Sequence, residues 1–156
     1  MPDLSAIYDR LGARLFRHAL AWTRCRASAE DAVHAAFAKL LQSRTAPRDV
    51  DAYLHVAVRR EASRLETRTG RTTSLDAVDD PLVEPRPGAA LESAEAVRRA
   101  LALLPPDQRE VVVLHVFEEL TFARIAELCA VSPNTVAARY RYARRRLEEE
   151  LRVPAR

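Results

Sequence analysis

Hydrophobic and polar residues recur with a helical period along most of the chain. In residues 4–24 the apolar positions lie three or four residues apart, which predicts one amphipathic helix. A second helix is predicted from Ser28, because the Ser-Ala-Glu-Asp sequence there can cap a helix and places acids in its first turn. A third is predicted over about residues 51–66, with Leu54, Val58 and Leu65 facing inward. Together these helices predict a first domain with a shared core.

The last third of the chain predicts two helices joined by a tight turn. Thr121 can cap a short helix that ends near Leu128, and Ser132 can cap the next, with Pro133 in its first turn. The apolar positions of that second helix are spaced by four, three, four and four residues: Val136, Tyr140, Ala143, Leu147 and Leu151. A short helix, a tight turn and a second helix form the arrangement that places a helix N-terminus in the DNA major groove.

Residues 67–93 interrupt the helical pattern. They contain two glycines and three prolines but few large apolar residues, which predicts an extended, acidic linker, longer than most connections inside a compact domain. After it, Ser93 can cap a helix that a Pro-Pro pair interrupts, and another helix precedes the helix-turn-helix. We therefore expect an all-α fold with a helical domain over 1–66, a flexible linker over 67–93 and a second helical domain over 94–156.

Charge is arranged in blocks that the net value of +3 conceals. Residues 1–66 and 96–156 each carry 11 basic and 8 acidic residues, whereas residues 67–95 carry 3 basic and 6 acidic ones. Nearly all the basic residues are arginine, whose planar guanidinium group suits phosphate and guanine recognition. Arginine and alanine richness is equally typical of a GC-rich genome, so composition alone does not decide the function.

Several classes of function find no support in the sequence. No apolar run approaches the roughly 18 residues that a membrane span needs, and the N-terminus lacks the pattern of a secretion signal, so we expect a cytoplasmic protein. The two cysteines lie outside any CxxC pattern, and the four histidines have no metal-ligand spacing. The sequence also lacks a glycine-rich phosphate loop and a nucleophile–base pattern. We therefore expect a protein that is not an enzyme, with no catalytic site, no metal and no cofactor.

The second helix of the helix-turn-helix carries the first set of candidate DNA-binding residues. Three lie near its N-terminal end, where base edges are within reach: Asn134, Thr135 and Arg139. Three more lie on outward faces and are expected to contact phosphate: Arg141, Arg144 and Arg145. The arginines at 144–146 also have a structural alternative, because each can form an ion pair with the glutamate four residues later, at 148–150.

The third helix of the first domain carries a second set, formed by outward arginines: Arg59, Arg60, Arg64 and Arg68. Opening a duplex requires a protein to hold a single strand electrostatically, and this basic surface is expected to contact such a strand. The alternative is an ordinary solvated face. Tyr53 is expected in the core rather than as a stacking platform, because it lies at the helix start among apolar neighbours.

Six short motifs follow one another along the two predicted domains. Four lie in the second domain: LPPDQREVVVL at 104–114, LTFARIA at 120–126, VSPNTV at 131–136 and YARRRL at 142–147. Two lie in the first: AEDAV at 29–33, followed by Phe37, and AYL at 52–54. In this order they resemble the motifs of sigma-70 family RNA polymerase sigma factors of the compact extracytoplasmic-function type. The resemblance covers nearly the whole chain.

The resemblance implies a sigma factor that binds core RNA polymerase and directs promoter-specific transcription initiation. The second, winged-helix-like domain would read the upstream minus-thirty-five element and meet the β flap, and the first would bind polymerase and melt the minus-ten element. The second helix would dock on the β′ clamp through an outer strip: Asp31, His34, Ala38 and Lys39. The linker would thread the RNA-exit path, with its acids facing a basic channel: Asp76, Asp79, Asp80 and Glu84. An anti-sigma factor is a further partner that the family commonly has.

Two other functions stay open on the sequence. One is an autonomous helix-turn-helix regulator that binds DNA without replacing the specificity subunit of polymerase. The other is a sigma mimic that acts mainly by binding another protein. Four residues depart from those usual in the family and keep both functions open: His34, Ala35, Arg60 and Arg64.

Overall fold

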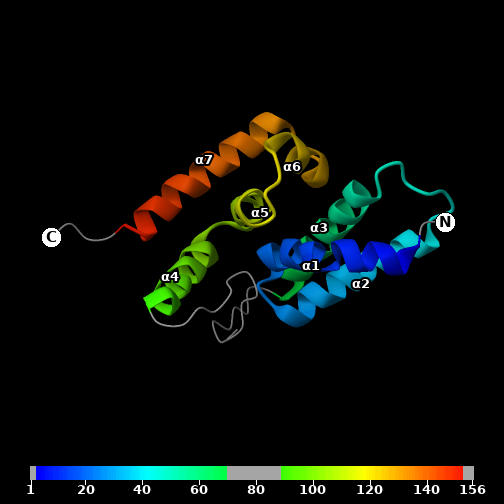
Figure 1. The fold of residues 1–156 in the computed structure, drawn as a ribbon, viewed down its shortest axis with the longest axis horizontal. Helices are drawn as coiled ribbons and strands as arrows, with labels where there is room; N and C mark the ends of the chain where they lie inside the picture. The colour runs from blue at the N-terminus through cyan, green and yellow to red at the C-terminus, as the bar shows by residue number, and fades with distance from the viewer. Residues whose placement is uncertain (1–2, 70–88, 153–156) are drawn as a thin grey trace.

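The computed structural model of the protein describes residues 3–69 and 89–152, without the side chains of residues 67–69 and 89–94. All regular structure in this part of the chain is helical (Figure 1). The elements in order are α1 (Leu4–Thr23), α2 (Arg26–Gln42), α3 (Val50–Thr69), α4 (Ala89–Leu103), α5 (Pro106–Val112), the π-helical turn η1 (Val113–Phe117), α6 (Phe122–Cys129) and α7 (Pro133–Glu150). The expected all-α fold class is confirmed.

The two helices of the helix-turn-helix begin as the sequence predicts. The Thr121 hydroxyl group accepts a hydrogen bond from the backbone N–H of Arg124 (3.1 Å), and Ser132 accepts one from that of Thr135 (3.1 Å). Each bond satisfies an N–H group that the first helical turn leaves without a partner. Ala130 takes left-handed backbone angles (φ 57°) at the end of α6, which turns the chain toward α7 within a few residues.

The start of α2 differs from the sequence prediction. The helix begins at Arg26 rather than at Ser28, with Cys25 in the capping position. The chain turns earlier because Arg24, with left-handed angles (φ 51°), already ends α1. The capping-box pattern therefore lies inside the first turn of the helix.

The helices on either side of the expected linker extend into it. α3 continues to Thr69, and α4 begins at Ala89 rather than near Ser93. Both boundaries lie inside the range 67–93. The acidic residues expected to face a basic channel lie outside the described residues: Asp76, Asp79, Asp80 and Glu84.

The helices α1, α2 and α3 form a three-helix domain around an aliphatic core. Leu15, Leu40 and Leu54, one from each helix, are at most 1% exposed. Burying a leucine side chain contributes roughly 1.5–3 kcal/mol, so each of these positions helps to hold the helices together. Tyr53 packs against this core as a partly buried residue, as expected.

The remaining helices form the second domain, in which α7 packs on α5 and α6. Leu114, Ile125 and Val136 are fully buried in its main core, and Tyr140 packs against them. A second cluster joins Leu101 and Leu104 of the α4 end to Ala143 of α7. The first four positions of the apolar stripe predicted along α7 therefore hold this helix on its domain. The fifth, Leu151, follows the end of the helix and is 39% exposed, so the stripe ends one turn earlier than predicted.

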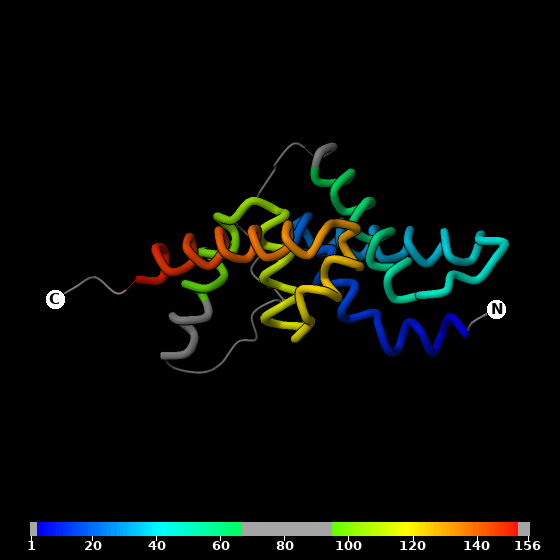
Figure 2. Tube along the Cα trace, turned by 90° about the horizontal axis from the view of Figure 1, so that it is seen from above, coloured from blue at the N-terminus to red at the C-terminus, as the bar shows by residue number. Residues whose placement is uncertain are grey.

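The two domains pack directly against each other. The helices α1 and α3 contact α5, η1 and α6, and α5 lies between the three-helix domain and α7 in Figure 1. Figure 2 shows from above that α1 begins near one end of the molecule and α7 ends near the other. Val113 of η1 is fully buried and belongs to the core cluster of the first domain. The contact is therefore continuous with a hydrophobic core.

Candidate nucleic-acid interface and domain contact

The outer face of α7 presents polar side chains to solvent. Asn134, Arg141 and Arg145 are exposed, and they lie on the side of the helix opposite the fully buried Val136 and Ala143. Among the residues that the structure describes, neither Arg141 nor Arg145 has an ion-pair partner. This face can therefore meet a polyanion without first breaking an ion pair.

Two other candidates on α7 already have partners. The Thr135 hydroxyl lies 2.9 Å from the hydroxyl of Ser132, within the cap of the helix. Arg144 Nε donates to Glu148 (3.0 Å), and this is the pairing four residues apart that the sequence offered as the structural alternative. A DNA contact by either side chain would have to compete with these local bonds.

Arg139 turns toward α5 rather than outward. Its Nε atom lies 3.4 Å from the Asp107 carboxylate, and its side chain is 22% exposed. One terminal guanidinium nitrogen of Arg139 is buried without a hydrogen-bond partner among the described residues. Leaving a buried donor unpaired costs about 1–3 kcal/mol, so this nitrogen of Arg139 lowers the stability of the folded protein. Its role as a base reader stays a prediction.

The fold separates the arginines predicted on α3. Arg60 and Arg64 are exposed, and Arg64 also pairs with a glutamate one turn earlier (2.7 Å). Arg59 lies at the contact between the domains, where its Nε atom donates to Glu110 of α5 (3.1 Å). The side chain of Arg68 lies outside the described residues. The basic surface predicted on this helix is thus partly covered by the second domain.

The outer strip predicted on α2 is open to solvent. Its four residues are all exposed: Asp31, His34, Ala38 and Lys39. Lys39 Nζ also donates to Glu61 of α3 (3.1 Å). His34 lines a hollow of about 620 Å³ between α1 and α2, which Tyr8 and Phe16 line from the other side. The strip is accessible to a protein partner.

A buried carboxylate lies at the centre of the contact between the domains. Glu110 of α5 is 0% exposed. Its Oε2 atom accepts hydrogen bonds from Trp22 Nε1 (2.7 Å) and His18 Nε2 (2.5 Å), and its Oε1 atom accepts one from Arg59 Nε (3.1 Å). Burial by itself would raise the pKa of Glu110, but the His18 hydrogen bond and the attraction of His18 and Arg59 lower it to about 2. The group is therefore an anion that three donors from the first domain compensate.

His55 of α3 extends this network. Its Nδ1 atom lies 2.9 Å from Nδ1 of His18, and both rings are buried. The sequence predicted no role for either histidine or for Glu110, because His18 is 37 residues from His55 and 92 from Glu110. The available signal was a polar residue on an apolar face: His18 follows Leu15 by three residues on the helical stripe.

Arg109 fastens the C-terminal ends of two helices to each other. This side chain is 4% exposed and donates to the carbonyl of Ala21 near the end of α1 (2.5 Å). It also donates to three carbonyls at the end of α4: Leu101 (2.8 Å), Ala102 (3.3 Å) and Leu104 (2.8 Å). The last carbonyls of a helix have no intrahelical partner and carry partial negative charge, so a buried guanidinium group satisfies several of them at once.

Two ion-paired sites flank the buried network. Glu118 at the end of η1 is 8% exposed and pairs with Arg14 (3.0 Å) and Arg17 of α1. Arg124 of α6 pairs with Asp49, just before α3 (2.7 Å), where both side chains are partly exposed. The ion pairs of Glu118 are shielded from solvent. The Asp49–Arg124 pair is screened by solvent and contributes less to stability.

His18, Glu110 and Cys129 bring potential ligand atoms within 4.8 Å of one another. Hydrogen bonding explains this cluster better than metal coordination. The 2.5 Å between His18 Nε2 and Glu110 Oε2 leaves no room for an ion between them, and both carboxylate oxygens already accept hydrogen bonds. Burial also raises the pKa of the Cys129 thiol, which opposes the thiolate that a metal requires.

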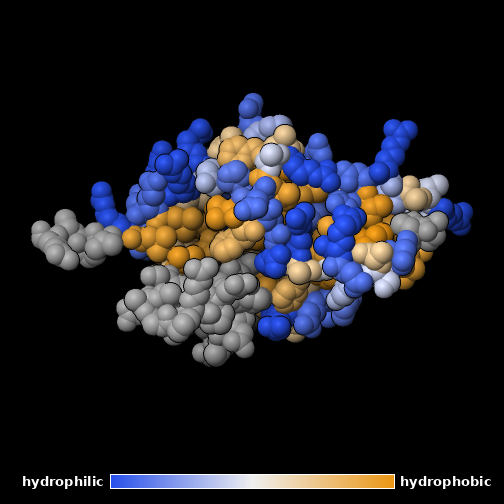
Figure 3. Space-filling view, viewed as in Figure 1, coloured by the Kyte–Doolittle hydropathy of each residue, from blue (hydrophilic) through white to orange (hydrophobic). Residues whose placement is uncertain are grey.

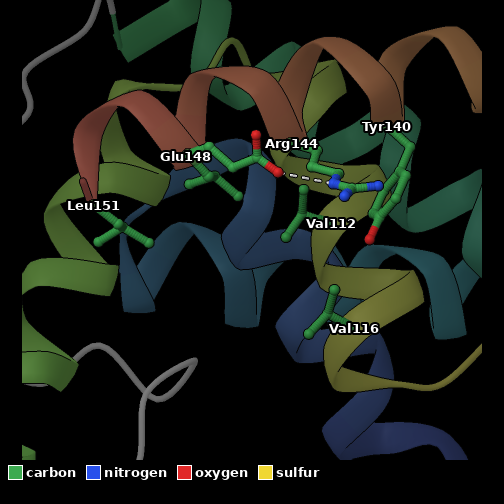
Figure 4. Close-up of a pocket in the computed structure, with 7 residues that line it drawn as sticks. Val112, Val116, Tyr140, Arg144, Glu148 and Leu151 are labelled. Carbon is green, nitrogen blue, oxygen red and sulfur yellow. Dashed lines mark hydrogen bonds and ion pairs between the residues drawn. The ribbon is translucent and has the colours of Figure 1, made fainter. Parts of the chain in front are cut away.

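An apolar groove of about 390 Å³ lies between α7 and the α5–η1 segment (Figure 4). Val112 and Val116 line it from one side, and Tyr140 of α7 and Leu151, just after this helix, line it from the other. Val116 is 54% exposed, which is unusual for a valine that has a neighbouring core to pack into. Figure 3 shows hydrophobic surface gathered below the hydrophilic ridge of α7 on the left of the view. The second domain thus has a polar outer face and an apolar flank.

Comparisons with known proteins match both domains. The family model described as Sigma-70 region 2 matches residues 7–72, and the model described as Sigma-70, region 4 matches residues 94–147. No curated protein matches the chain. Among solved structures, the sigma factor RpoE from Bartonella quintana, crystallised in complex with the anti-sigma factor NepR, is similar with a TM-score of 0.71 and 23% identity. The match covers 99% of this chain and 100% of that one, and at this identity it concerns the fold. Among the described helices, none has both the length and the apolar content to span a membrane.

Proposed function

The chain belongs to the sigma-70 family of RNA polymerase sigma factors. We propose that it is of the extracytoplasmic-function type and that its two domains together direct promoter-specific transcription initiation. The observation that carries this proposal is the match of one chain to both sigma-70 regions, each on its own helical domain. The partners are core RNA polymerase and promoter DNA. The second domain would read the upstream element, and the first would melt the downstream element. The protein would act in the cytoplasm, without an enzymatic activity of its own.

On α7 we assign the DNA contact to the outer face. Asn134 lies in the first turn, where a recognition helix reaches base edges, and Arg141 and Arg145 follow on the same side without an ion-pair partner among the described residues. Arg139, held against Asp107, would position α7 on α5 and would reach DNA only after leaving that pair. Thr135 and Arg144 would contribute once their local bonds are exchanged for contacts to DNA.

On the first domain we assign the downstream DNA contact to Arg60 and Arg64, with Arg68 beyond them. Arg59 would join them only when the second domain moves away from α3, because Glu110 holds it in the packed form. The open strip on α2 would dock on the β′ clamp, as the family resemblance implies. The apolar groove beside α7 would be the site on the second domain that binds the β flap through hydrophobic contacts. An anti-sigma factor is a further candidate partner, since the similar RpoE structure was solved with one.

Transcription in vitro with purified core polymerase and a promoter library tests the function as a whole. We expect promoter-specific initiation that depends on this protein. Binding of duplex DNA without core polymerase, with no initiation, would favour an autonomous regulator. Failure of both, with capture of a small regulatory protein, would favour a sigma mimic.

Variants of α7 test the residue assignment. Asn134→Ala should alter selectivity among upstream elements, whereas Arg141→Ala and Arg145→Ala should lower affinity across sequences and each reduce the salt dependence by about one released counterion. Arg146→Ala is the matched control, because this exposed arginine pairs with Glu150 (3.6 Å) and should have little effect. Equal losses of DNA affinity in Arg141→Ala, Arg145→Ala and the control Arg146→Ala would contradict the assignment.

Variants of the apolar groove test the β flap contact. Val116→Glu should weaken binding to core polymerase without destabilising the fold, because the side chain is 54% exposed. Leu103→Glu is the matched control, since Leu103 is 52% exposed on α4 and does not line the groove. If both variants bind core polymerase as the unaltered protein does, the flap contact lies elsewhere.

A further inference from the structure

Two histidines and one carboxylate meet where the two domains pack. His18 and His55 come from the first domain and Glu110 from the second, and all three side chains are at most 1% exposed. They form one chain of contacts, Nδ1 to Nδ1 between the rings (2.9 Å) and Nε2 to Oε2 between His18 and Glu110 (2.5 Å). This chain joins α3 to α5 through α1, so any change in it acts on the contact between the domains.

The number of hydrogens in this chain is limited by geometry. Because Glu110 is an anion, it can only accept, so His18 Nε2 must carry a hydrogen. The two Nδ1 atoms can then share one hydrogen: one ring donates and the other accepts. A second hydrogen would place two N–H groups head to head across 2.9 Å, which is repulsive whichever ring held the first one.

The surroundings of His55 oppose a further positive charge. Charged and titratable groups act on it from the elements packed around it: Arg14 and His18 of α1, Arg124 of α6 and Asp49 before α3. Beyond His18 follow Glu110 of α5 and, bonded to Glu110, Arg59 of α3. Burial, His18, Arg14 and Arg124 hold the pKa of His55 well below its ordinary value, and Asp49 only partly offsets them. His55 is therefore neutral in the packed form.

We propose that the His18–His55–Glu110 contact is a protonation-sensitive latch between the two domains, closed while the two Nδ1 atoms share one hydrogen and released when a second hydrogen binds at this contact, on Nδ1 of His55. Release separates α5 from α1 and α3, so it also frees Arg59 from Glu110. The basic surface of α3 then gains a third exposed arginine beside Arg60 and Arg64. The latch depends only on the contact between the domains, whatever DNA the protein reads.

The sign of the pH dependence follows from linkage. A histidine whose pKa is lowered in the closed form binds its proton more tightly in the open form, where the pKa returns to about 6.5. The closed form is therefore favoured above about pH 6.5, and below it the ratio of open to closed molecules rises up to about tenfold per pH unit for one proton. Glu110 acts in a separate range, between its ordinary pKa of about 4.5 and its lowered value of about 2.

The protein carries its own reporter of this contact. Trp22 is the only tryptophan. Its ring N–H bonds to Glu110 (2.7 Å), and the Arg59 guanidinium group lies 5.1 Å from the ring centre. Opening would hydrate the indole ring and shift its emission to longer wavelength. Because a protonated histidine can itself quench tryptophan, the radius of gyration from small-angle X-ray scattering serves as a second readout.

The experiment titrates the full chain from about pH 8 to about pH 5 and follows both readouts. We expect a red shift of emission and an increase in radius of gyration that develop together below about pH 6.5. His55→Gln, which keeps a hydrogen-bonding side chain that does not titrate, should remove both changes in this range. His34→Gln is the matched control, because His34 is exposed on α2, and it should keep them.

Two results would overturn the latch. One is a constant radius of gyration down to about pH 5 in the unaltered protein; the other is an unchanged transition in His55→Gln. Should His55→Gln lose its helical circular dichroism, NMR titration of the histidine rings in the unaltered protein decides instead. A buried ring that takes up its proton together with the expansion supports the latch, and four rings that titrate without any expansion refute it.

Discussion

Arg109 should be the most costly single arginine to alter in this protein, because its five N–H groups serve carbonyls from two helices. We consider Arg109→Lys, which keeps the positive charge but replaces the planar fork by a single ammonium group. Arg109 is 4% exposed and donates to four carbonyls, one at the end of α1 and three at the end of α4. An ammonium group at the end of a straight stem can keep one or two of these bonds.

The magnitude follows from the bonds that are lost. A hydrogen bond to a charged group contributes about 1.5–3 kcal/mol, and a buried carbonyl left without a partner costs about 1–3 kcal/mol. Because the carbonyl of Ala102 is only partly buried, water can replace that bond. Loss of the remaining one or two buried bonds should lower the free energy of unfolding by about 3 kcal/mol.

Urea unfolding followed by helical circular dichroism measures this change. With a slope of about 2 kcal/mol per molar urea, the midpoint should fall by about 1.5 M. Arg99→Lys is the control, since Arg99 is 69% exposed and lies 4.0 Å from Glu95, and its effect should stay within about 0.5 kcal/mol. If Arg109→Lys also stays within about 0.5 kcal/mol of the unaltered protein, the guanidinium fork does not hold these helix ends.

Three further predictions concern a cap, an ion pair and two thiols. Ser132→Ala should lower the free energy of unfolding by about 1 kcal/mol, because it removes the side-chain cap of α7, and an unchanged urea midpoint would contradict this. A double-mutant cycle on Asp49 and Arg124 should give a coupling of only about 0.5 kcal/mol, because both side chains are partly exposed; a coupling above about 2 kcal/mol would show that the pair is shielded. At about pH 8, Cys25 should be alkylated quickly and Cys129 only on unfolding, because hydrogen bonds from Ser28 lower the pKa of the exposed Cys25 thiol whereas burial raises that of Cys129; equal rates by mass spectrometry would refute this.

The helices and their inward faces were predictable because helix formation is local. Thr121 and Ser132 each cap a helix through a backbone N–H only three residues away, so a short window of sequence contains the whole interaction. The start of α2 was wrong for a related reason. Ser28 looked like a cap, but the left-handed Arg24 and extended Cys25 had already turned the chain, and no pattern marks a non-glycine residue that adopts such angles.

The candidate interface was predictable in part. Helical period places Arg141 and Arg145 on the outer face of α7, and both are exposed. The same period could not show that Arg139 pairs with Asp107 of another helix or that Arg59 pairs with Glu110. An arginine on the flank of a helix gives the same sequence pattern whether its side chain faces water or a neighbouring domain.

By itself the sequence determined two all-α domains, a helix-turn-helix with a basic second helix, and a set of motifs whose sigma-70 resemblance the region models confirm. Only the tertiary structure decided that the domains pack through a buried carboxylate, and that this contact covers Arg59. The physical reason is distance along the chain. His18 and Glu110 are 92 residues apart, and nothing in either local pattern encodes their approach. Burial then converts an ordinary glutamate and two ordinary histidines into a coupled network, because hydrogen bonds away from water are electrostatically stronger and an unpaired polar group is costly.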